Sequence, residues 1–256
     1  MSASDAGWLR VIGTGPGPDH WMTPETAAIL ERATDLVGYA PYVARCPERP
    51  GQIRHASDNR VELDRARHAL EMAAAGRRVA VVSGGDPGVF AMAAAVMEAI
   101  DLGPAAWRRL DVTVHPGVSA MQAAAARLGA PLGADFCAIS LSDNLKPWEV
   151  VARRLEAAAT VDFVIALYNP ASKARPKQIF DAFALLRGVK APETVVVFAR
   201  AVGRPDERIV VTTLAGADPG QVDMATCVII GNSATRTIDR GDGREPWVYS
   251  PRSIAD

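Results

Sequence analysis

Short apolar runs alternate with segments of helical periodicity along almost the whole chain. Runs of strand length, rich in Val, Ile, Leu and Ala, occupy Trp8–Ile12, Asp35–Gly38, Arg78–Val82, Leu110–Val114, Phe136–Leu141, Asp162–Tyr168, Thr194–Ala199, Ile209–Thr213 and Cys227–Gly231. Because helical patterns separate the earlier runs, we expect an α/β fold with mostly parallel sheets covered by helices. From Thr194 onward the runs follow one another through short connections, which predicts a mixed second sheet with some antiparallel pairing.

Two helix starts carry local signals. Thr23-Pro24-Glu25 combines a hydroxyl N-cap, a proline at the first helical position and an acid near the positive end of the helix dipole. Asp58 or Asn59 is expected to open a second helix that ends at Gly76. Beyond Ile238, frequent glycine and proline predict an extended loop.

A change of composition suggests the domain organisation. Ser119 is expected to cap a helix that ends at Gly129, and Gly, Ala and Pro then dominate as far as Asp135. We therefore expect an N-terminal α/β domain over residues 1–133 and a C-terminal α/β domain over residues 134–256.

Composition excludes several classes of protein. A formal net charge of -1 argues against a general nucleic-acid binder, which normally carries a basic excess. No apolar stretch is long enough to span a bilayer, and no signal peptide is expected before the first apolar run. Cys46, Cys137 and Cys227 are far apart and form no CxxC pattern, so we expect neither disulfides nor a metal site, and a cytoplasmic location.

The first ligand-type loop is Gly13-Thr14-Gly15-Pro16-Gly17-Pro18, which directly follows a predicted strand. Glycines at a strand's carboxyl end allow close approach to a ligand. A dinucleotide-binding G-x-G-x-x-G is not formed, because the sixth position is Pro18 and prolines lack the amides that hold a pyrophosphate. An ordinary strand-to-helix loop remains the alternative.

The second loop, Ser83–Phe90, follows the strong strand around Val82 and contains Gly84, Gly85 and Asp86. Asp86 could accept hydrogen bonds from a ligand in the crevice at the strand ends. Spacing alone supports equally well an N-cap for a helix that begins at Pro87.

Three further segments place polar groups at strand ends. His115–Ala120 does not complete a nucleophile elbow, so Ser119 is better interpreted as a helix cap, and His115 as a hydrogen-bonding group. Tyr168–Arg175 and Gly231–Arg236 add hydroxyl, amide and cationic groups that suit a carboxylate-bearing ligand, with a solvated helix start and a polar turn as their respective alternatives. Loops of this kind in both halves indicate one site between two domains.

In their order along the chain, Gly13–Gly17, Gly84–Pro87, Pro116–Ala120 and the strand ending at Gly231 resemble the signatures of the tetrapyrrole (corrin and porphyrin) methylase family. The resemblance covers nearly the whole chain. It implies two α/β domains with an interdomain trough, usually in a homodimer, and S-adenosyl-L-methionine as methyl donor, with S-adenosyl-L-homocysteine as product.

Other segments are similar to the branch of the family that methylates carbon 17 of precorrin-3B, or its cobalt-carrying counterpart, with contraction of the macrocycle: Val37–Tyr42, Ser140–Trp148, Ala166–Pro170 and Gly231–Arg236. Gly84 departs from this branch, in which many members have serine. Another methylation position within the family, a nicotinamide-dependent oxidoreductase and a non-catalytic tetrapyrrole carrier are the rival interpretations.

The resemblance also implies roles for individual residues. The expected donor contacts are Pro16, Gly85, Asp86, Val89, Phe90, Ser119, Ala120, Asn169, Ala199 and Thr226. The candidates for proton transfer are Tyr168, His115 and Asp143, and a site that only positions the substrate is equally tenable. For the carboxylate arms of the tetrapyrrole we expect a cationic rim of Lys146, Lys173, Arg175 and Arg236.

Overall fold

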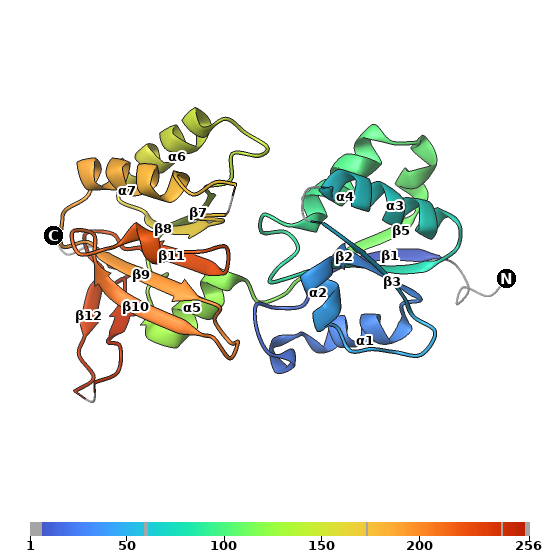
Figure 1. Cartoon of the computed structure of the whole chain (residues 1–256), viewed down its shortest axis with the longest axis horizontal. Coiled ribbons are helices and arrows are strands. Elements are labelled where there is room, and N and C mark those ends of the chain that lie inside the picture. The colour runs from blue at the N-terminus through green and yellow to red at the C-terminus, as the bar shows by residue number, and fades with distance from the viewer. Residues whose placement is uncertain (1–6, 59–60, 173, 242, 254–256) are drawn as a thin grey trace. The chain divides into compact units, whose positions relative to one another are not determined.

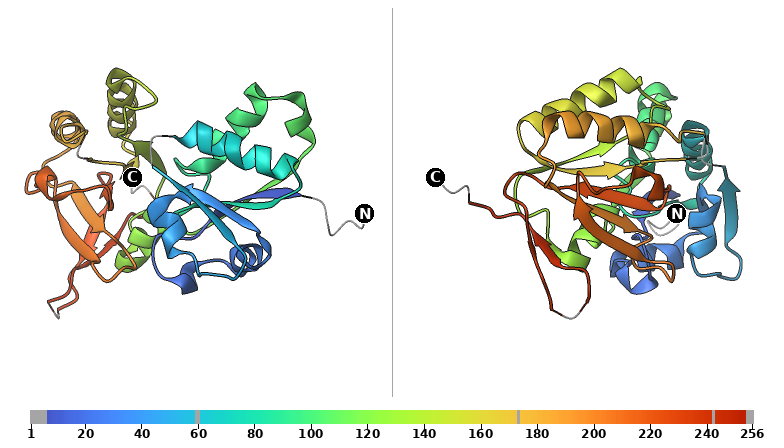
Figure 2. Two further views of the ribbon diagram at one scale, coloured as in Figure 1. Left: turned by 45° about the vertical axis from the view of Figure 1, so that its right-hand side comes forward. Right: turned by 60° about the vertical axis from the view of Figure 1, so that its left-hand side comes forward.

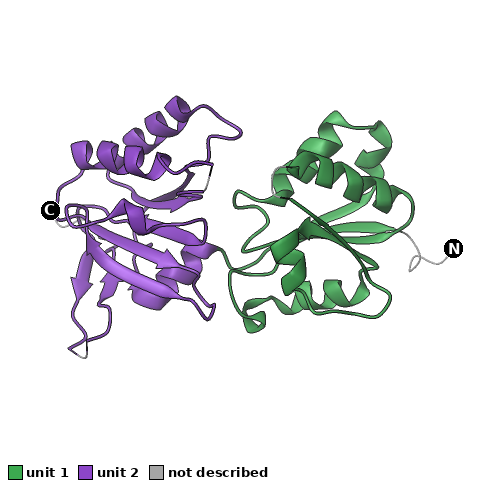
Figure 3. Cartoon of the chain, viewed as in Figure 1, with its two compact units in different colours: residues 1–119 green, residues 120–256 purple. Residues whose placement is uncertain are grey.

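The computed structural model describes residues 7–58, 61–172, 174–241 and 243–253 (Figure 1, Figure 2). The chain forms two compact units, Met1–Ser119 and Ala120–Asp256 (Figure 3). The division lies before the domain boundary expected after residue 133, because the helix and the short strand in between pack with the second unit. The trough expected between the domains stays a prediction.

Unit 1 is built on a five-stranded sheet in the order β3-β2-β4-β1-β5, with every neighbouring pair parallel. Its strands are β1 (Trp8–Gly13), β2 (Asp35–Tyr39), β3 (Ile53–Ser57), β4 (Arg78–Ser83) and β5 (Asp111–His115). Its helices are α1 (Pro24–Arg32), α2 (Ala40–Arg45), α3 (Glu62–Ala74) and α4 (Met92–Leu102), with short 3-10 turns at Asp19–Trp21 and Ala105–Arg109.

Both faces of this sheet are covered by helices (Figure 1). Leu9, Val79 and Val81 pack with α3 and α4, whereas Ile12 and Val82 pack with α1 and α2. A strand with apolar residues on both faces has no polar alternation, which explains the continuous apolar runs that the sequence shows.

Unit 2 contains a second five-stranded sheet in the order β10-β9-β11-β8-β7. Only β7 and β8 are parallel neighbours, so the predicted mixed sheet is confirmed. Its strands are β7 (Phe136–Ser140), β8 (Val164–Tyr168), β9 (Val195–Arg200), β10 (Arg208–Thr213) and β11 (Thr226–Ile230). Its helices are α5 (Ala120–Leu128), α6 (Trp148–Thr160) and α7 (Gln178–Val189), with a 3-10 turn at Pro219–Gln221. Helices α6 and α7 cover one face of this sheet (Figure 1).

A small third sheet corrects two expectations from the sequence. The segment after Ile238 is not all loop, because β13 (Trp247–Tyr249) pairs with β12 (Arg236–Ile238) and with β6 (Gly129–Ala130). Gly129, expected to be no more than a helix terminator, therefore also begins a strand after α5. The third sheet packs within unit 2 beside α5.

Local signals predicted some helix boundaries correctly. The Thr23 side chain accepts a hydrogen bond from the N–H of Thr26 at 3.1 Å, which confirms the predicted N-cap of α1. Helix α3 begins at Glu62 and not at Asp58, and the alternative start Asn59 lies outside the described residues. Among the described helices, none is long and apolar enough to cross a lipid bilayer.

Candidate functional site

In unit 1, three glycine-bearing loops come together because they follow the neighbouring strands β4, β1 and β5. The carboxyl ends of parallel strands lie at one edge of the sheet, where ligands bind in open α/β folds. Gly15 and Gly85 exchange backbone hydrogen bonds, with N···O distances of 3.2 Å and 2.9 Å. Both glycines have a φ of +72°, a left-handed conformation that residues with a Cβ rarely adopt.

The loops contact one another through bare backbone. A Cβ at Gly13 would lie 2.5 Å from the carbonyl oxygen of Gly85 and 2.8 Å from the amide nitrogen of Gly117. A real Cβ atom almost never comes this close to another atom, so no other residue fits at this position without a shift of the backbone. The glycines predicted as ligand-site residues therefore also set how closely the three loops approach one another.

Asp86 joins two of these loops. Its Oδ1 accepts from the N–H of Gly88 at 2.8 Å, and its Oδ2 accepts from the N–H of Gly117 at 3.0 Å. The N-cap interpretation is wrong, because α4 begins only at Met92. The carboxylate thus holds the loop after β5 against the loop after β4.

The other expected donor contacts of unit 1 lie on the same loops, and Ala120, which opens unit 2, directly follows the loop after β5. Pro16 and Ser119 are buried, Val89 and Ala120 are half-buried, and Phe90 is 47% exposed. Phe90 has a φ of +53°, which for an aromatic residue costs on the order of 1–3 kcal/mol. Strain of this kind is typical of ligand-binding segments. Here the strained residue lies two positions before the first residue of α4.

His115 is held from two sides. Its Nδ1 lies 3.0 Å from Oε1 of Glu25, and its Nε2 lies 2.7 Å from the hydroxyl of Thr113. A ring with both nitrogens engaged within the protein is suited to fixing the end of β5. This geometry does not favour His115 for proton transfer.

In unit 2, the register of the strands brings two of the expected site residues, Tyr168 and Thr226, to one edge of the sheet together with their cross-strand partners. Ser140 at the end of β7 pairs with Tyr168 at the end of β8. Strands β8 and β9 both run antiparallel to β11, and Thr226 at its start pairs with Arg200 at the end of β9. The ends of β7, β8 and β9 therefore lie at the same edge as the beginning of β11.

Tyr168 and Asn169 are fixed by hydrogen bonds at this edge. The hydroxyl oxygen of Tyr168 accepts from the N–H of Met121, at the beginning of α5, at 3.0 Å. The side-chain amide of Asn169 donates to the hydroxyl of Ser140 at 3.0 Å, and Asn169 has a φ of +51°. Asparagine tolerates the left-handed region better than most residues.

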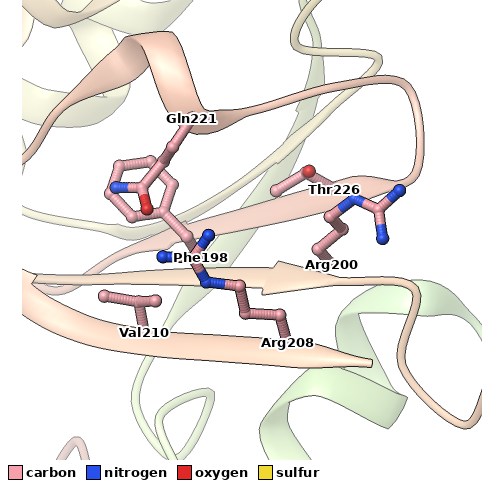
Figure 4. A pocket seen from close by; sticks show the side chains of 6 residues that line it. All are labelled: Phe198, Arg200, Arg208, Val210, Gln221 and Thr226. Carbon is pink, nitrogen blue, oxygen red and sulfur yellow. The ribbon is translucent and has the colours of Figure 1, made fainter. Parts of the chain in front are cut away.

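Ala199 and Thr226 are both buried, but their side chains point to opposite faces of the sheet. Thr226 shares its face with Phe198 and lines a hollow of about 10 Å³, room for one water molecule at most (Figure 4). The other lining residues are Arg200, Arg208, Val210 and Gln221. The donor contacts expected from Ala199 and Thr226 stay predictions, and their side chains lie on opposite faces of the sheet.

Asp143 belongs to a polar network beside α7. Its Oδ2 accepts from the side-chain amide of Gln178 at 2.8 Å, and its Oδ1 lies 3.9 Å from Nε of Arg175. Arg175 is 9% exposed, so the solvated helix start is wrong for it, and its guanidinium also lies 3.5 Å from the carbonyl oxygen of Asn169. Both contacts of the Arg175 guanidinium, to Asp143 and to Asn169, are longer than the roughly 2.7–2.9 Å that is usual for charge-assisted hydrogen bonds.

The remaining expected cations differ in environment. Lys146 is half-buried, and its pKa is lowered by burial and by repulsion from Arg154. Arg236 is exposed and donates to the carbonyl oxygens of Ser233 and Thr235 at 2.9 Å and 3.1 Å. Lys173 lies outside the described residues.

Sequence reasoning missed three participants in unit 2: Ser140, Gln178 and Arg154. Ser140 could have been found as a polar residue that ends a buried strand, the same signal that singled out Tyr168. The sequence offers no comparable signal for Gln178 or Arg154, because a polar residue in a helix is common and neither stands at the end of a strand.

Thiolate and metal chemistry find no support in the described part of the chain. Burial raises the pKa of Cys46 to about 11 and that of Cys227 to about 12, so both thiols are protonated at neutral pH. No three His, Cys, Asp or Glu side chains among the described residues are placed to hold a metal ion.

Residues 9–218 match the sequence profile of the Tetrapyrrole (Corrin/Porphyrin) Methylases. A precorrin-3B C(17)-methyltransferase of Sinorhizobium is 62% identical over 249 residues, which cover 97% of this chain and 98% of the relative. A probable cobalt-factor III C(17)-methyltransferase of Salmonella typhimurium is 41% identical, with 90% of this chain and 95% of the relative covered.

Solved structures agree with these sequence matches. A crystal structure of the methyltransferase CobJ, 53% identical in sequence, superposes with a TM-score of 0.91 over 96% of this chain and 100% of the other. The α/β fold predicted from the sequence is therefore confirmed.

Proposed function

The chain belongs to the tetrapyrrole (corrin/porphyrin) methylase family, and we propose that it methylates carbon 17 of precorrin-3B and contracts the macrocycle to give precorrin-4, in cobalamin biosynthesis. S-Adenosyl-L-methionine is the methyl donor of this reaction. The observation that carries the proposal is 62% identity to a precorrin-3B C(17)-methyltransferase over almost the full length of both chains.

The second candidate is the corresponding reaction on cobalt-factor III, supported by 41% identity to a probable enzyme of that type. The higher identity to the precorrin-3B enzyme favours the metal-free substrate. Incubation of the protein with each tetrapyrrole and methyl-labelled donor, followed by mass spectrometry, tests both. We expect one labelled methyl group in the product from precorrin-3B, and a product only from cobalt-factor III would contradict the proposal.

For the donor we propose the strand-end loops of unit 1, with contacts from Pro16, Gly85, Asp86, Val89 and Phe90, and from Ser119 and Ala120. The support is the closely packed group of glycine loops that these residues share. The sulfonium of the donor is already electrophilic, so the protein's part is to hold its methyl group in line with the reacting ring carbon. The contacts expected from Asn169, Ala199 and Thr226 stay predictions.

For the macrocycle we propose the polar strand ends of unit 2. Acetate and propionate arms make a corrin precursor a polyanion at neutral pH, whereas the chain carries a net charge of only -1. Recognition must therefore depend on local cations. Lys146 beside Arg154 is repelled by its neighbour, and a bound carboxylate would relieve that repulsion. Arg175 could replace its long contacts with a bidentate pair, Arg236 would add an exposed charge, and the contact expected from Lys173 stays a prediction from the sequence.

For proton transfer during ring contraction we propose Tyr168. The backbone N–H of Met121, at the N-terminus of α5, donates to the hydroxyl oxygen of Tyr168, which holds the hydroxyl in a fixed position and leaves its proton available for transfer. For His115 and Asp143 we propose positioning roles, since the polar atoms of both side chains already lie near partners within the protein. A site that only positions the substrate is the alternative, and Tyr168→Phe distinguishes it.

We also propose a homodimer in the cytoplasm. Ile238, Trp247 and Tyr249 form an exposed apolar face on the β12–β13 hairpin, with exposed fractions of 48%, 47% and 37%. Such a face suits contact with a second copy. For the location, the support is that the sequence spaces its three cysteines far apart without a CxxC pattern, which is typical of proteins in a reducing compartment. Light scattering at micromolar concentration should give the dimer mass, and a monomer would contradict the proposal.

A further inference from the structure

Helix α2 packs against strands β2 and β4, and a glycine in β2 makes this approach possible. A Cβ at Gly38, at the end of β2, would lie 3.0 Å from Cγ2 of Val43 in α2 and 3.0 Å from the carbonyl oxygen of Val82 in β4. Without a side chain at Gly38, the short helix can pack directly over the strand that leads into the second glycine loop.

Tyr42 of α2 occupies the space beside Gly84 in that loop. A Cβ built on Gly84 would lie 2.7 Å from Cε1 and 2.9 Å from Cζ of the Tyr42 ring. Tyr39 supports the ring through an edge-to-face contact, with the two ring centroids 5.3 Å apart. The aromatic ring therefore takes the place that a side chain at position 84 would need, immediately before Gly85 and Asp86.

Arg45 connects the same helix to the first glycine loop. Its Nη2 donates to the carbonyl oxygen of Gly17 at 2.8 Å and lies 3.4 Å from that of Gly15. Tyr42 and Arg45 are three positions apart in the helix, and neighbours at this spacing share a face. One face of α2 thus contacts the loops after both β1 and β4.

The far end of α2 is fixed by a residue of the adjacent strand. Arg54 of β3 donates to the carbonyl oxygens of Val43, Cys46 and Pro47 at 2.7 Å, 2.9 Å and 2.7 Å. These bonds add a charged donor to carbonyls at the end of the helix and just beyond it, one of which, that of Val43, also accepts from the N–H of Cys46. They also place a cation at the negative end of the helix dipole. A helix of six residues, too short to be stable by itself, is held rigid in this way.

We propose that helix α2 is a brace that sets the position of the donor-binding loops, with Tyr42 and Arg45 as positioning residues. The size match between Tyr42 and Gly84 fixes the loop that carries Gly85 and Asp86, and Arg45 fixes the loop that carries Pro16. This inference rests on the proposed function, in which these loops bind the methyl donor.

The first test is a double-mutant cycle on the full-length protein with S-adenosylhomocysteine as the titrated ligand. Gly84→Val should raise the dissociation constant about tenfold, because a branched side chain is larger than the serine of many relatives and cannot share the space with the Tyr42 ring. In the Tyr42→Ala background the same valine should cost less than about twofold, since the space is then empty. Tyr42→Phe keeps the ring and should keep the affinity. An equal cost of the valine in both backgrounds would overturn the brace.

The second test removes the arginine contact. Arg45→Ala should raise the dissociation constant for S-adenosylhomocysteine about fivefold, in proportion to a lost charge-assisted hydrogen bond. Arg49→Ala is the matched control, since Arg49 follows closely in the chain and pairs with Glu31 on the surface. The KM for the tetrapyrrole should stay unchanged in both variants, which separates loop positioning from a general loss of structure.

The outcomes separate the two proposals. If the unmodified protein binds no S-adenosylhomocysteine, the proposed donor site fails and the brace with it. If it binds and the Gly84, Tyr42 and Arg45 variants bind as tightly, the donor site stands and only the brace is overturned.

Discussion

At the strand ends of unit 1, backbone packs on backbone at Gly13, Gly85 and Gly117, whereas at the strand ends of unit 2 side chains bond to one another. The first arrangement leaves no room for a Cβ at its closest point. The second consists of hydroxyl, amide, carboxylate and guanidinium groups, whose identity can change without a change of backbone. The two halves therefore tolerate substitution very differently.

This difference suits two kinds of ligand. A backbone cradle keeps one shape, which fits a donor that stays the same whatever macrocycle is methylated. A side-chain surface can be altered residue by residue, which fits a substrate that differs between relatives, such as precorrin-3B and cobalt-factor III. If the comparison holds, substitutions in the loops of unit 1 change the affinity for the donor, whereas substitutions at the strand ends of unit 2 change the kinetics with the tetrapyrrole.

The largest effect is expected from Gly13→Ala. The new methyl group would lie 2.5 Å from the carbonyl oxygen of Gly85, and overpacking of this severity costs about 3 kcal/mol of unfolding free energy. Thermal unfolding and calorimetry with S-adenosylhomocysteine should both show the loss. Gly188→Ala in α7, where a Cβ meets nothing within 4 Å, is the matched control and should be stabilising by about 0.5–1 kcal/mol. An unchanged affinity for the donor in Gly13→Ala would contradict the idea that the close backbone packing of unit 1 shapes the donor site.

Tyr168→Phe should lower kcat about 100-fold if the hydroxyl transfers a proton during ring contraction. The N–H of Met121 would also lose its acceptor. Single-turnover product analysis measures the rate of the reaction, and titration with S-adenosylhomocysteine measures the affinity for the donor. Donor affinity should be unchanged, and an undiminished kcat would leave Tyr168 with a purely positioning role.

Asp86→Ala should weaken the attachment of the loop after β5 and raise the donor dissociation constant about 20-fold. The carboxylate accepts two backbone N–H groups, and hydrogen bonds to a charged group are worth about 1.5–3 kcal/mol. Asp86→Asn keeps acceptor atoms and should recover part of the affinity. Calorimetry on the three proteins is sufficient, and equal affinities would show that donor binding does not depend on this link.

Arg175→Met should raise the KM for the tetrapyrrole about tenfold and leave donor affinity nearly unchanged, because a partly desolvated guanidinium–carboxylate contact would be lost. Since the substitution also leaves Asp143 without its cation, the variant should be compared with Arg175→Met/Asp143→Asn. The KM effect should persist in the double variant. Unchanged tetrapyrrole kinetics would make Arg175 a structural residue.

The smallest effect belongs to Arg236→Ala, since an exposed cation contributes under about 1 kcal/mol to an ionic contact. The KM for the tetrapyrrole should rise by no more than about threefold, and the difference from the unmodified protein should shrink at high salt. Steady-state kinetics at low and high ionic strength measure it. An effect that does not depend on salt would indicate a packing role instead.

The sequence predicted the fold wherever the decisive signal was local. The apolar runs marked strands on both units, and Thr23-Pro24 marked the start of α1. It missed β3 (Ile53–Ser57), an edge strand that contains Arg54 and His55 and has no apolar run. It also missed β13 (Trp247–Tyr249), whose pairing with β6 joins distant parts of the chain. Such strands are stabilised by their partners and not by their own pattern.

Site residues followed the same rule. Glycine loops and polar strand ends could be found in the sequence, and family membership was confirmed. The partners could not be found, because the bond from the Gly117 amide to Asp86 spans 31 positions and involves a backbone group that every residue but proline has. The burial of Arg175 was equally hidden, since Met224, whose sulfur lies 3.9 Å from Nη2 of Arg175, is 49 positions away in the chain.

The hydrogen bonds within the loops of unit 1 have a consequence for the charge of the ligand that we propose for them. The amides of Gly15, Gly85, Gly88 and Gly117 already donate within the loops, and Pro16, Pro18, Pro87 and Pro116 have no amide hydrogen. If the donor binds here as proposed, an adenine nucleotide in its place would give up the hydration of its phosphates without gaining these amides as donors, which is costly for an anion. S-Adenosylmethionine carries no phosphate and would not meet this cost. We therefore expect the prolines and internal bonds of these loops to disfavour adenine nucleotides, although they share the adenosine group of the donor.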